Sequence, residues 1–201
     1  EYYASFLAYQ KVIDVYPRSE LTEEILERQY RTGNLYFSGQ KEKIFGVAIV
    51  PALDKALEIF EKVVSNSPYG KYADLAQFKI GECYKKGGQY KEAAEAFGKL
   101  VNNYPKSLLF EQAKYEEAYC TYKMSLKPNY DQAPTEEAIR EFEDFVKSKE
   151  TGQTIGDAQE ALVRLQEKKA ESLYNTALFY EKSGHYQSSI IYYKEITDIY
   201  P

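Results

Sequence analysis

One phrase recurs along this 201-residue chain and constrains its fold more than any other feature. An aromatic residue is preceded four positions earlier by a small residue and followed eight positions later by proline in all but one copy. A small and an aromatic residue four apart share one helix face, where a neighbouring helix can approach closely. Proline then ends the helix, because it lacks an amide hydrogen and restricts the residue before it. The small, aromatic and final residues of the five copies are Ser5, Tyr9 and Pro17; Ala56, Phe60 and Pro68; Ala93, Phe97 and Pro105; Ala138, Phe142 and Glu150; and Ser189, Tyr193 and Pro201.

A second helical pattern precedes most copies, so the sequence predicts pairs of helices. Residues 27–40 and 75–90 match in register, and residues 110–123 and 170–186 continue the series. Such pairs resemble the tetratricopeptide repeat. The residues that match its signature are Ile80, Gly81, Tyr84, Gly88, Ala93, Phe97 and Pro105, while Gln77 replaces the usual first Trp. The resemblance implies an all-α, right-handed solenoid of about five helical pairs. Residues 1–201 would form it as a single domain whose first pair lacks its first helix.

Uneven spacing between the copies indicates insertions. The inner turn of the first complete pair gains KIFGVAIVPAL at residues 43–53, and that of the third complete pair gains residues 125–135. Insertions of this kind often form a binding edge. Residues 155–183 have no helix breaker after Gly156 and predict one long helix of about 28 residues. The first insertion either folds back to cap the solenoid or docks a partner, because a solvated turn would not need so many apolar residues: Ile44, Phe45, Val47, Ile49 and Val50.

Nothing in the sequence indicates a reaction centre. The net charge of -5 and the interspersed Lys and Glu residues argue against nucleic acid as a partner. The single histidine, His185, stands where Gln89 stands in the equivalent turn, and a base needs a nucleophile beside it. Cys83 and Cys120 occupy equivalent positions of adjacent repeats, so we expect both to be buried, small apolar residues that do not form a disulfide. We therefore expect no catalytic residue, no cofactor and no metal site.

The first helix of each pair lines the concave face of a tetratricopeptide array, and it carries an aromatic residue at one fixed position. Such a ladder of rings suits an extended peptide that has aromatic side chains of its own. The alternative is that the rings only pack between adjacent helices, and the sequence leaves both open. The candidate groove residues, in pairs one turn apart, are Tyr30 and Asn34, Phe78 and Glu82, Tyr115 and Tyr119, and Tyr174 and Leu178.

Three segments make the whole chain resemble the YfiO family of outer-membrane lipoproteins: residues 66–84, 129–146 and 170–201. Two features depart from that family, because the insertion at 43–53 is long and Lys149-Glu150 replace a Tyr-Pro pair. The resemblance implies a lipid-anchored scaffold of the β-barrel assembly machinery on the periplasmic face of the outer membrane. Its N-terminal repeats would receive unfolded outer-membrane proteins, and its C-terminal repeats would dock on the core barrel subunit. Membrane contact would come only from a lipid anchor upstream of residue 1.

Two other functions compete with this interpretation. A periplasmic repeat protein that coordinates envelope constriction with the Tol system would need a separate oligomerisation segment outside these residues. A tetratricopeptide co-chaperone would need a basic clamp repeated along its groove. The only cations near the predicted groove are Lys85, Lys86 and Lys123, and they do not repeat.

Overall fold

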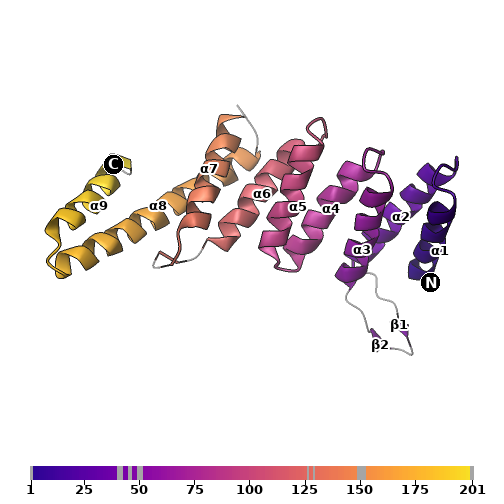
Figure 1. Ribbon diagram of the computed structural model, residues 1–201, viewed down its shortest axis with the longest axis horizontal. Coiled ribbons are helices and arrows are strands. Elements are labelled where there is room, and N and C mark those ends of the chain that lie inside the picture. Colours follow the sequence, from indigo (N-terminus) through magenta and orange to yellow (C-terminus); the bar gives the residue numbers. More distant parts are fainter. Residues whose placement is uncertain are drawn as a thin grey trace. The chain divides into compact units, whose positions relative to one another are not determined.

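The computed structural model describes residues 2–39, 43–44, 47–48, 52–125, 127–128, 130–148 and 153–199 (Figure 1). Helices account for most of this part of the chain. They are α1 (Tyr2–Val15), α2 (Thr22–Phe37), α3 (Ala52–Asn66), α4 (Ala73–Lys86), α5 (Tyr90–Asn103), α6 (Phe110–Met124), α7 (Ala133–Lys147), α8 (Gln153–Lys182) and α9 (Tyr186–Ile199). The predicted pairs are therefore confirmed as α2–α3, α4–α5, α6–α7 and α8–α9, and α1 stands alone as the second helix of the first pair.

The chain divides into two compact units, Glu1–Ala113 and Lys114–Pro201, with the boundary inside α6. We call them unit 1 and unit 2 and describe each by itself. That all residues form a single solenoid stays a prediction.

The small-and-aromatic phrase determines how the helices of unit 1 pack. Phe60 and Phe97 are fully buried, each against a glycine of the preceding helix of its pair. A Cβ atom on Gly33 would lie 2.6 Å from Phe60 Cε1, and one on Gly81 would lie 2.6 Å from Phe97 Cε1. Real Cβ atoms do not approach that closely, so only glycine lets the two helices come this near.

The first copy of the phrase behaves differently. Ser5 is exposed and Tyr9 is half-buried, whereas Phe6 and Ile13 supply the buried face of α1. The reason is that the described residues hold no helix in front of α1 that would cover the face carrying Ser5. The helix α1 packs instead on α2 and α3, which bury a neighbouring stripe of its surface.

Unit 2 is organised by the long helix α8. Its 30 residues confirm the predicted long helix. The first half buries Ala158 and Leu165 in a core shared with Ala118 of α6 and Phe142 of α7. The second half pairs with α9, where Ala177 and Ser189 are buried. One helix therefore packs on the α6–α7 pair with its first half and forms the α8–α9 pair with its second half.

The equivalent turns at Gly88-Gln89 and Gly184-His185 have the same backbone. Both glycines have φ 76°, a left-handed conformation that glycine adopts without a steric penalty. Gln89 N–H donates to Tyr84 O at 3.0 Å, and His185 N–H donates to Tyr180 O at 2.9 Å, as in a Schellman C-cap. His185 is therefore an exposed turn residue, as its equivalence to Gln89 predicts.

The insertion between α2 and α3 adds a minor non-helical feature to the all-α fold. Strands β1 (Lys43–Ile44) and β2 (Val47–Ala48) form a short antiparallel ribbon in which Lys43 pairs with Ala48 and Ile44 with Val47. The β-branched residues of this insertion favour extended backbone over helix. Phe45, Ile49 and Val50 lie outside the described residues, as do Lys149, Glu150 and Pro201. Whether the insertion caps the repeats or docks a partner stays a prediction.

Candidate protein-binding cleft

Three tyrosines of α6 line a cleft of about 260 Å³ in unit 2, which we call the tyrosine cleft. Tyr115, Tyr119 and Tyr122 are spaced by four and then three residues, so they share one face of α6. The opposite wall is the first half of α8. The residues that complete the lining are Lys123 of α6 and Asp157, Glu160, Ala161 and Arg164 of α8.

The rings form a continuous row that is anchored in the core. The Tyr115 ring lies 6.2 Å from the Phe142 ring and 5.7 Å from the Phe145 ring, both of which are buried. Tyr119 stacks on Tyr115 with ring centroids 6.3 Å apart, and Tyr122 follows Tyr119 at 6.3 Å. All three tyrosines are half-buried, so each offers part of a ring to the cleft while its base is held by packing.

Charged groups of both signs surround this row. Lys123 Nζ lies 5.1 Å from the centroid of the Tyr119 ring, within the range of a cation–π contact. Arg164 forms an ion pair with Glu160 at 2.5 Å. Burial raises the pKa of Tyr115, and the carboxylate of Asp157 raises it further, so its hydroxyl stays protonated and can donate a hydrogen bond. The cleft thus combines apolar rings with hydrogen-bonding and ionic groups, which suits a peptide rather than a highly charged ligand.

Sequence reasoning found only part of this cleft. It named Tyr115 and Tyr119 but missed Tyr122, which the seven-residue spacing from Tyr115 would have revealed. Arg164 and the other α8 residues could not be inferred from the repeat, because the first half of α8 lies outside the repeated pattern.

The predicted aromatic groove residues of unit 1, Tyr30 and Phe78, contact rings of neighbouring elements. Phe78 is 5% exposed and meets Phe97 edge-to-face at 5.2 Å. Tyr30 is half-buried between Phe60 at 5.7 Å and Tyr72 at 5.5 Å.

Their polar neighbours are engaged locally. Asn34 Nδ2 donates to Tyr30 O at 3.0 Å, and Glu82 pairs with Lys79 at 2.6 Å. In unit 2, Tyr174 is 49% exposed with its ring 6.0 Å from that of Tyr193, and Leu178 is half-buried. A peptide-binding role for these residues stays a prediction.

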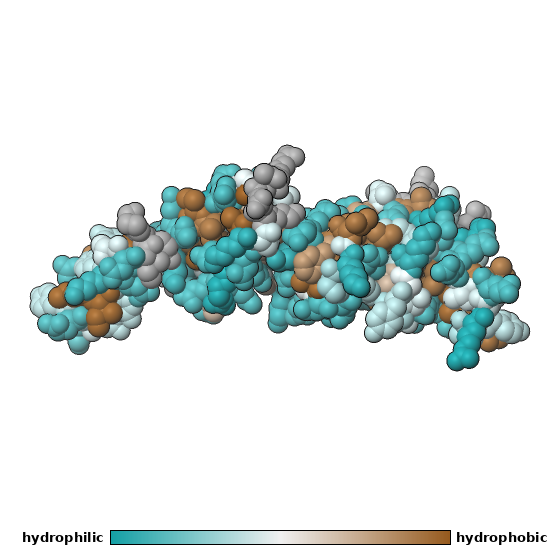
Figure 2. Space-filling view, turned by 90° about the horizontal axis from the view of Figure 1, so that it is seen from above, coloured by the Kyte–Doolittle hydropathy of each residue, from teal (hydrophilic) through white to brown (hydrophobic). Residues whose placement is uncertain are grey.

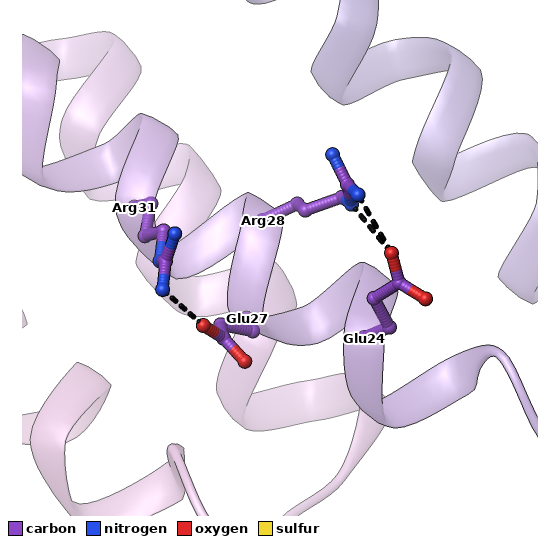
Figure 3. Close-up of polar contacts among 4 residues, drawn as sticks. All are labelled: Glu24, Glu27, Arg28 and Arg31. Carbon is purple, nitrogen blue, oxygen red and sulfur yellow. Dashed lines mark hydrogen bonds and ion pairs between the residues drawn. The ribbon is translucent and has the colours of Figure 1, made fainter.

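A second hollow, of about 460 Å³, lies between α1 and α2 in unit 1. Its charged wall consists of two ion pairs along α2, Arg28 with Glu24 at 2.6 Å and Arg31 with Glu27 (Figure 3). Each pair joins residues four apart on one helix, so the charges satisfy each other locally and, being exposed to solvent, add little to stability. No net charge remains on this wall to select a ligand.

The cysteines are placed as the repeat predicts. Cys83 and Cys120 are both buried and form no disulfide, and burial raises the pKa of the Cys83 thiol to about 12. A thiol with so high a pKa is not a nucleophile at neutral pH. In the part of the chain that the structure describes, no three His, Cys, Asp or Glu side chains converge as metal ligands would. None of the described helices has the length and apolar character needed to cross a membrane.

Comparison with known proteins relates the chain to a family of outer membrane lipoproteins. The model of the YfiO family, described as an outer membrane lipoprotein, matches residues 51–201. The outer membrane protein assembly factor BamD of Caulobacter vibrioides is 23% identical over 145 residues, which cover 72% of this chain and 48% of that protein. The chain thus spans about half the length of this curated relative.

Solved structures of repeat proteins are also similar to this chain. A crystal structure of MamA has 14% identity and a TM-score of 0.43, covering 96% of this chain and 85% of that one. YrrB, described as a TPR protein with an unusual peptide-binding site, has 17% identity and a TM-score of 0.39, covering 96% and 93%.

The family match covers the three complete pairs from α4 to α9 together with α3, and therefore includes the whole tyrosine cleft. Proteins with this family and fold are protein-interaction modules that are generally not enzymes. The family's description as an outer membrane lipoprotein is consistent with a location in the cell envelope. This chain belongs to the YfiO family of outer-membrane lipoproteins.

Proposed function

We propose that the chain is a non-catalytic scaffold of the machinery that assembles β-barrel proteins in the outer membrane, and that the tyrosine cleft receives extended segments of unfolded barrel proteins. The observation that carries the proposal is the row of Tyr115, Tyr119 and Tyr122 beside Lys123 and Arg164. Barrel strands alternate aromatic or aliphatic residues with polar ones. An extended segment could therefore stack its rings on the tyrosines and turn its polar groups to the charged rim.

The position of this cleft places the proposed substrate site in a different part of the chain from the one that the family resemblance implies. The family resemblance assigns substrate to the N-terminal repeats, but Phe78 of unit 1 is buried, and Tyr30, half-buried like the tyrosines of unit 2, packs on Phe60 and Tyr72. The tyrosines of unit 2 have both an anchored base and a partly open face. We therefore assign the substrate segment to unit 2. Docking on the core barrel subunit would use another surface, and a lipid anchor upstream would hold the scaffold at the periplasmic face of the outer membrane.

A peptide-binding measurement tests this assignment. The probe is a fluorescent peptide that copies one barrel strand, together with a second version in which serine replaces each aromatic residue. Replacing Tyr119 and Tyr122 by alanine should weaken binding of the aromatic peptide about 10-fold, because truncating central aromatic contacts costs roughly 1–2 kcal/mol. The serine peptide should bind weakly to every variant.

The matched control is Tyr130→Ala, because Tyr130 belongs to unit 2, is 62% exposed and lies outside the cleft lining. It should leave affinity unchanged. Circular dichroism of each variant separates a lost contact from a lost fold. Equal affinity of the wild-type protein and the double variant for the aromatic peptide would refute the assignment.

A further inference from the structure

The turns that join successive pairs in unit 1 have the same backbone but different side chains. In the turns at residues 67–72 and 104–109, the N–H groups of Gly70 and Ser107 donate to the carbonyls of Ser67 and Tyr104 at 3.0 and 2.9 Å. A second bond of the same kind closes each turn at the next helix. Equivalent positions at the two tips therefore project alike, and these are Tyr69 with Lys106 and Lys71 with Leu108.

Each tip carries one apolar side chain and one lysine. Tyr69 is 94% exposed and Leu108 is fully exposed, whereas large apolar side chains on a soluble surface are usually covered in part by neighbours. Lys71 and Lys106 are exposed, and neither forms an ion pair with a described carboxylate. The equivalent turn between α1 and α2 carries Arg18 and Glu20 instead, so the apolar tips are particular to two of the three turns.

The two turns are joined by a hydrogen bond and line a hollow of about 510 Å³. Tyr104 Oη donates to Pro68 O at 2.9 Å, which ties one turn to the other. Ser107 Oγ donates to Asp74 Oδ2 at 2.5 Å, so the carboxylate at the base of the hollow already has a partner. Lys71 and Lys106 both line the hollow. These turns lie along one edge of unit 1 in Figure 1, and Figure 2 looks onto that edge, where apolar patches interrupt the hydrophilic surface.

We propose that these two turns, with Tyr69, Lys71, Lys106 and Leu108 at their tips, form a contact with an anionic phospholipid surface. Lys71 and Lys106 would bracket lipid phosphates at the mouth of the hollow. Tyr69 and Leu108 would enter the boundary between headgroups and acyl chains, where tyrosine has its apolar ring buried and its hydroxyl hydrated. Protruding apolar tips favour a lipid surface as the partner, because a protein partner would need two pockets complementary to the tips. This contact goes beyond scaffolding, and beyond the anchor-only contact that the family resemblance implies.

The sequence contains no tryptophan, which allows a site-specific test. Tyr69→Trp places a single reporter at the tip, and Tyr186→Trp is the control, because Tyr186 is also an exposed tyrosine at a helix-joining turn but lies in unit 2. With equimolar phosphatidylglycerol and phosphatidylcholine vesicles, emission of Tyr69→Trp should shift to the blue and be quenched by brominated lipid. The control should show neither effect. Pure phosphatidylcholine vesicles should bind at least about 10-fold more weakly, because each lysine near an anionic surface strengthens binding about 5-fold.

Two variants test the named residues in the Tyr69→Trp background. Lys71→Gln with Lys106→Gln should lower partitioning into the anionic vesicles about 10-fold or more, and Leu108→Ser should lower it several-fold. Ile191→Ser, at an exposed apolar residue of unit 2, should have no effect. No emission shift at lipid excess, equal quenching of the Tyr186→Trp control, or unchanged partitioning of the lysine variant would each overturn the proposal. Complete displacement by inorganic phosphate would also overturn it, because it would indicate a pocket for the free anion.

Discussion

Gly81 and Phe97 touch across the α4–α5 pair so closely that a single added carbon atom on Gly81 would lie 2.6 Å from the Phe97 ring. Phe97 is fully buried and cannot swing away without displacing its neighbours. The contact shows why the repeated phrase matters, because the aromatic residue of one helix fits where the other helix has no side chain. The same relationship joins Gly33 to Phe60 in the preceding pair.

Gly81→Ala should therefore destabilise the protein, even though alanine favours helix. Overpacking a full core costs about 1–3 kcal/mol, which exceeds the gain of roughly 1 kcal/mol from replacing a helical glycine. Gly156→Ala is the matched control, since Gly156 lies in α8, is exposed and has no other atom within 4 Å of the place that an added methyl group would take. It should stabilise the protein by about 0.5–1 kcal/mol. Urea unfolding midpoints measure both, and a stabilising Gly81→Ala would contradict the packing described here.

The stability of the protein should fall as pH rises from about 4.5 to about 7, through Glu141 of α7. Burial raises the pKa of Glu141 from 4.5 to about 7, and the nearby carboxylates of Glu117 and Glu137 also raise it. Between these pH values the folded protein holds a proton that the unfolded chain has released, so raising the pH favours unfolding. Solvent screening limits the effect to the order of 1 kcal/mol.

Glu141→Gln should reduce this pH dependence and make the protein more stable than wild type at pH 8. Asp144→Asn, at an exposed position of the same helix, should leave the slope unchanged. The measurement is the free energy of unfolding in urea across the pH range. A wild-type slope that survives Glu141→Gln would assign the effect to other groups.

Both thiols should resist modification in the folded protein. Cys83 and Cys120 are buried, and the raised pKa of Cys83 keeps its thiol protonated at neutral pH. Titration with a chromogenic disulfide reagent should detect almost no reactive thiol in buffer and two in denaturant. Fast labelling of either cysteine in buffer would show that the helices around it open readily.

Much of this fold could be predicted from the sequence, because it rests on local rules that repeat. The small-and-aromatic phrase predicted the pairs, and the absence of breakers after Gly156 predicted the long α8. The rule failed at Ser5 and Tyr9, where burial depends on a neighbouring helix rather than on the helix itself. The short strands β1 and β2 were not predicted, because the insertion that contains them has no repeat to be compared with.

The candidate cleft was only half predictable for a related reason. Tyr115 and Tyr119 lie at repeat positions and so could be named from the pattern. Arg164 and Glu160 come from the first half of α8, which folds along α6 without matching any repeat. Packing of a non-repeated segment depends on tertiary contacts, which periodicity does not encode. Phe78 shows the converse, since it is 5% exposed although its equivalent in sequence, Tyr115, is half-buried.

Photo-crosslinking tests the central claim, that the tyrosine cleft holds an extended barrel segment, most directly. A benzophenone amino acid replaces Tyr119 in one variant and Tyr130 in another, and each is irradiated with the aromatic strand peptide. Mass spectrometry then maps the crosslinked peptide residue. The account predicts efficient crosslinks from position 119 to residues beside the peptide's aromatic side chains, abolished by the serine version, and few from position 130. Equal crosslinking from both positions, or none from position 119, would contradict it.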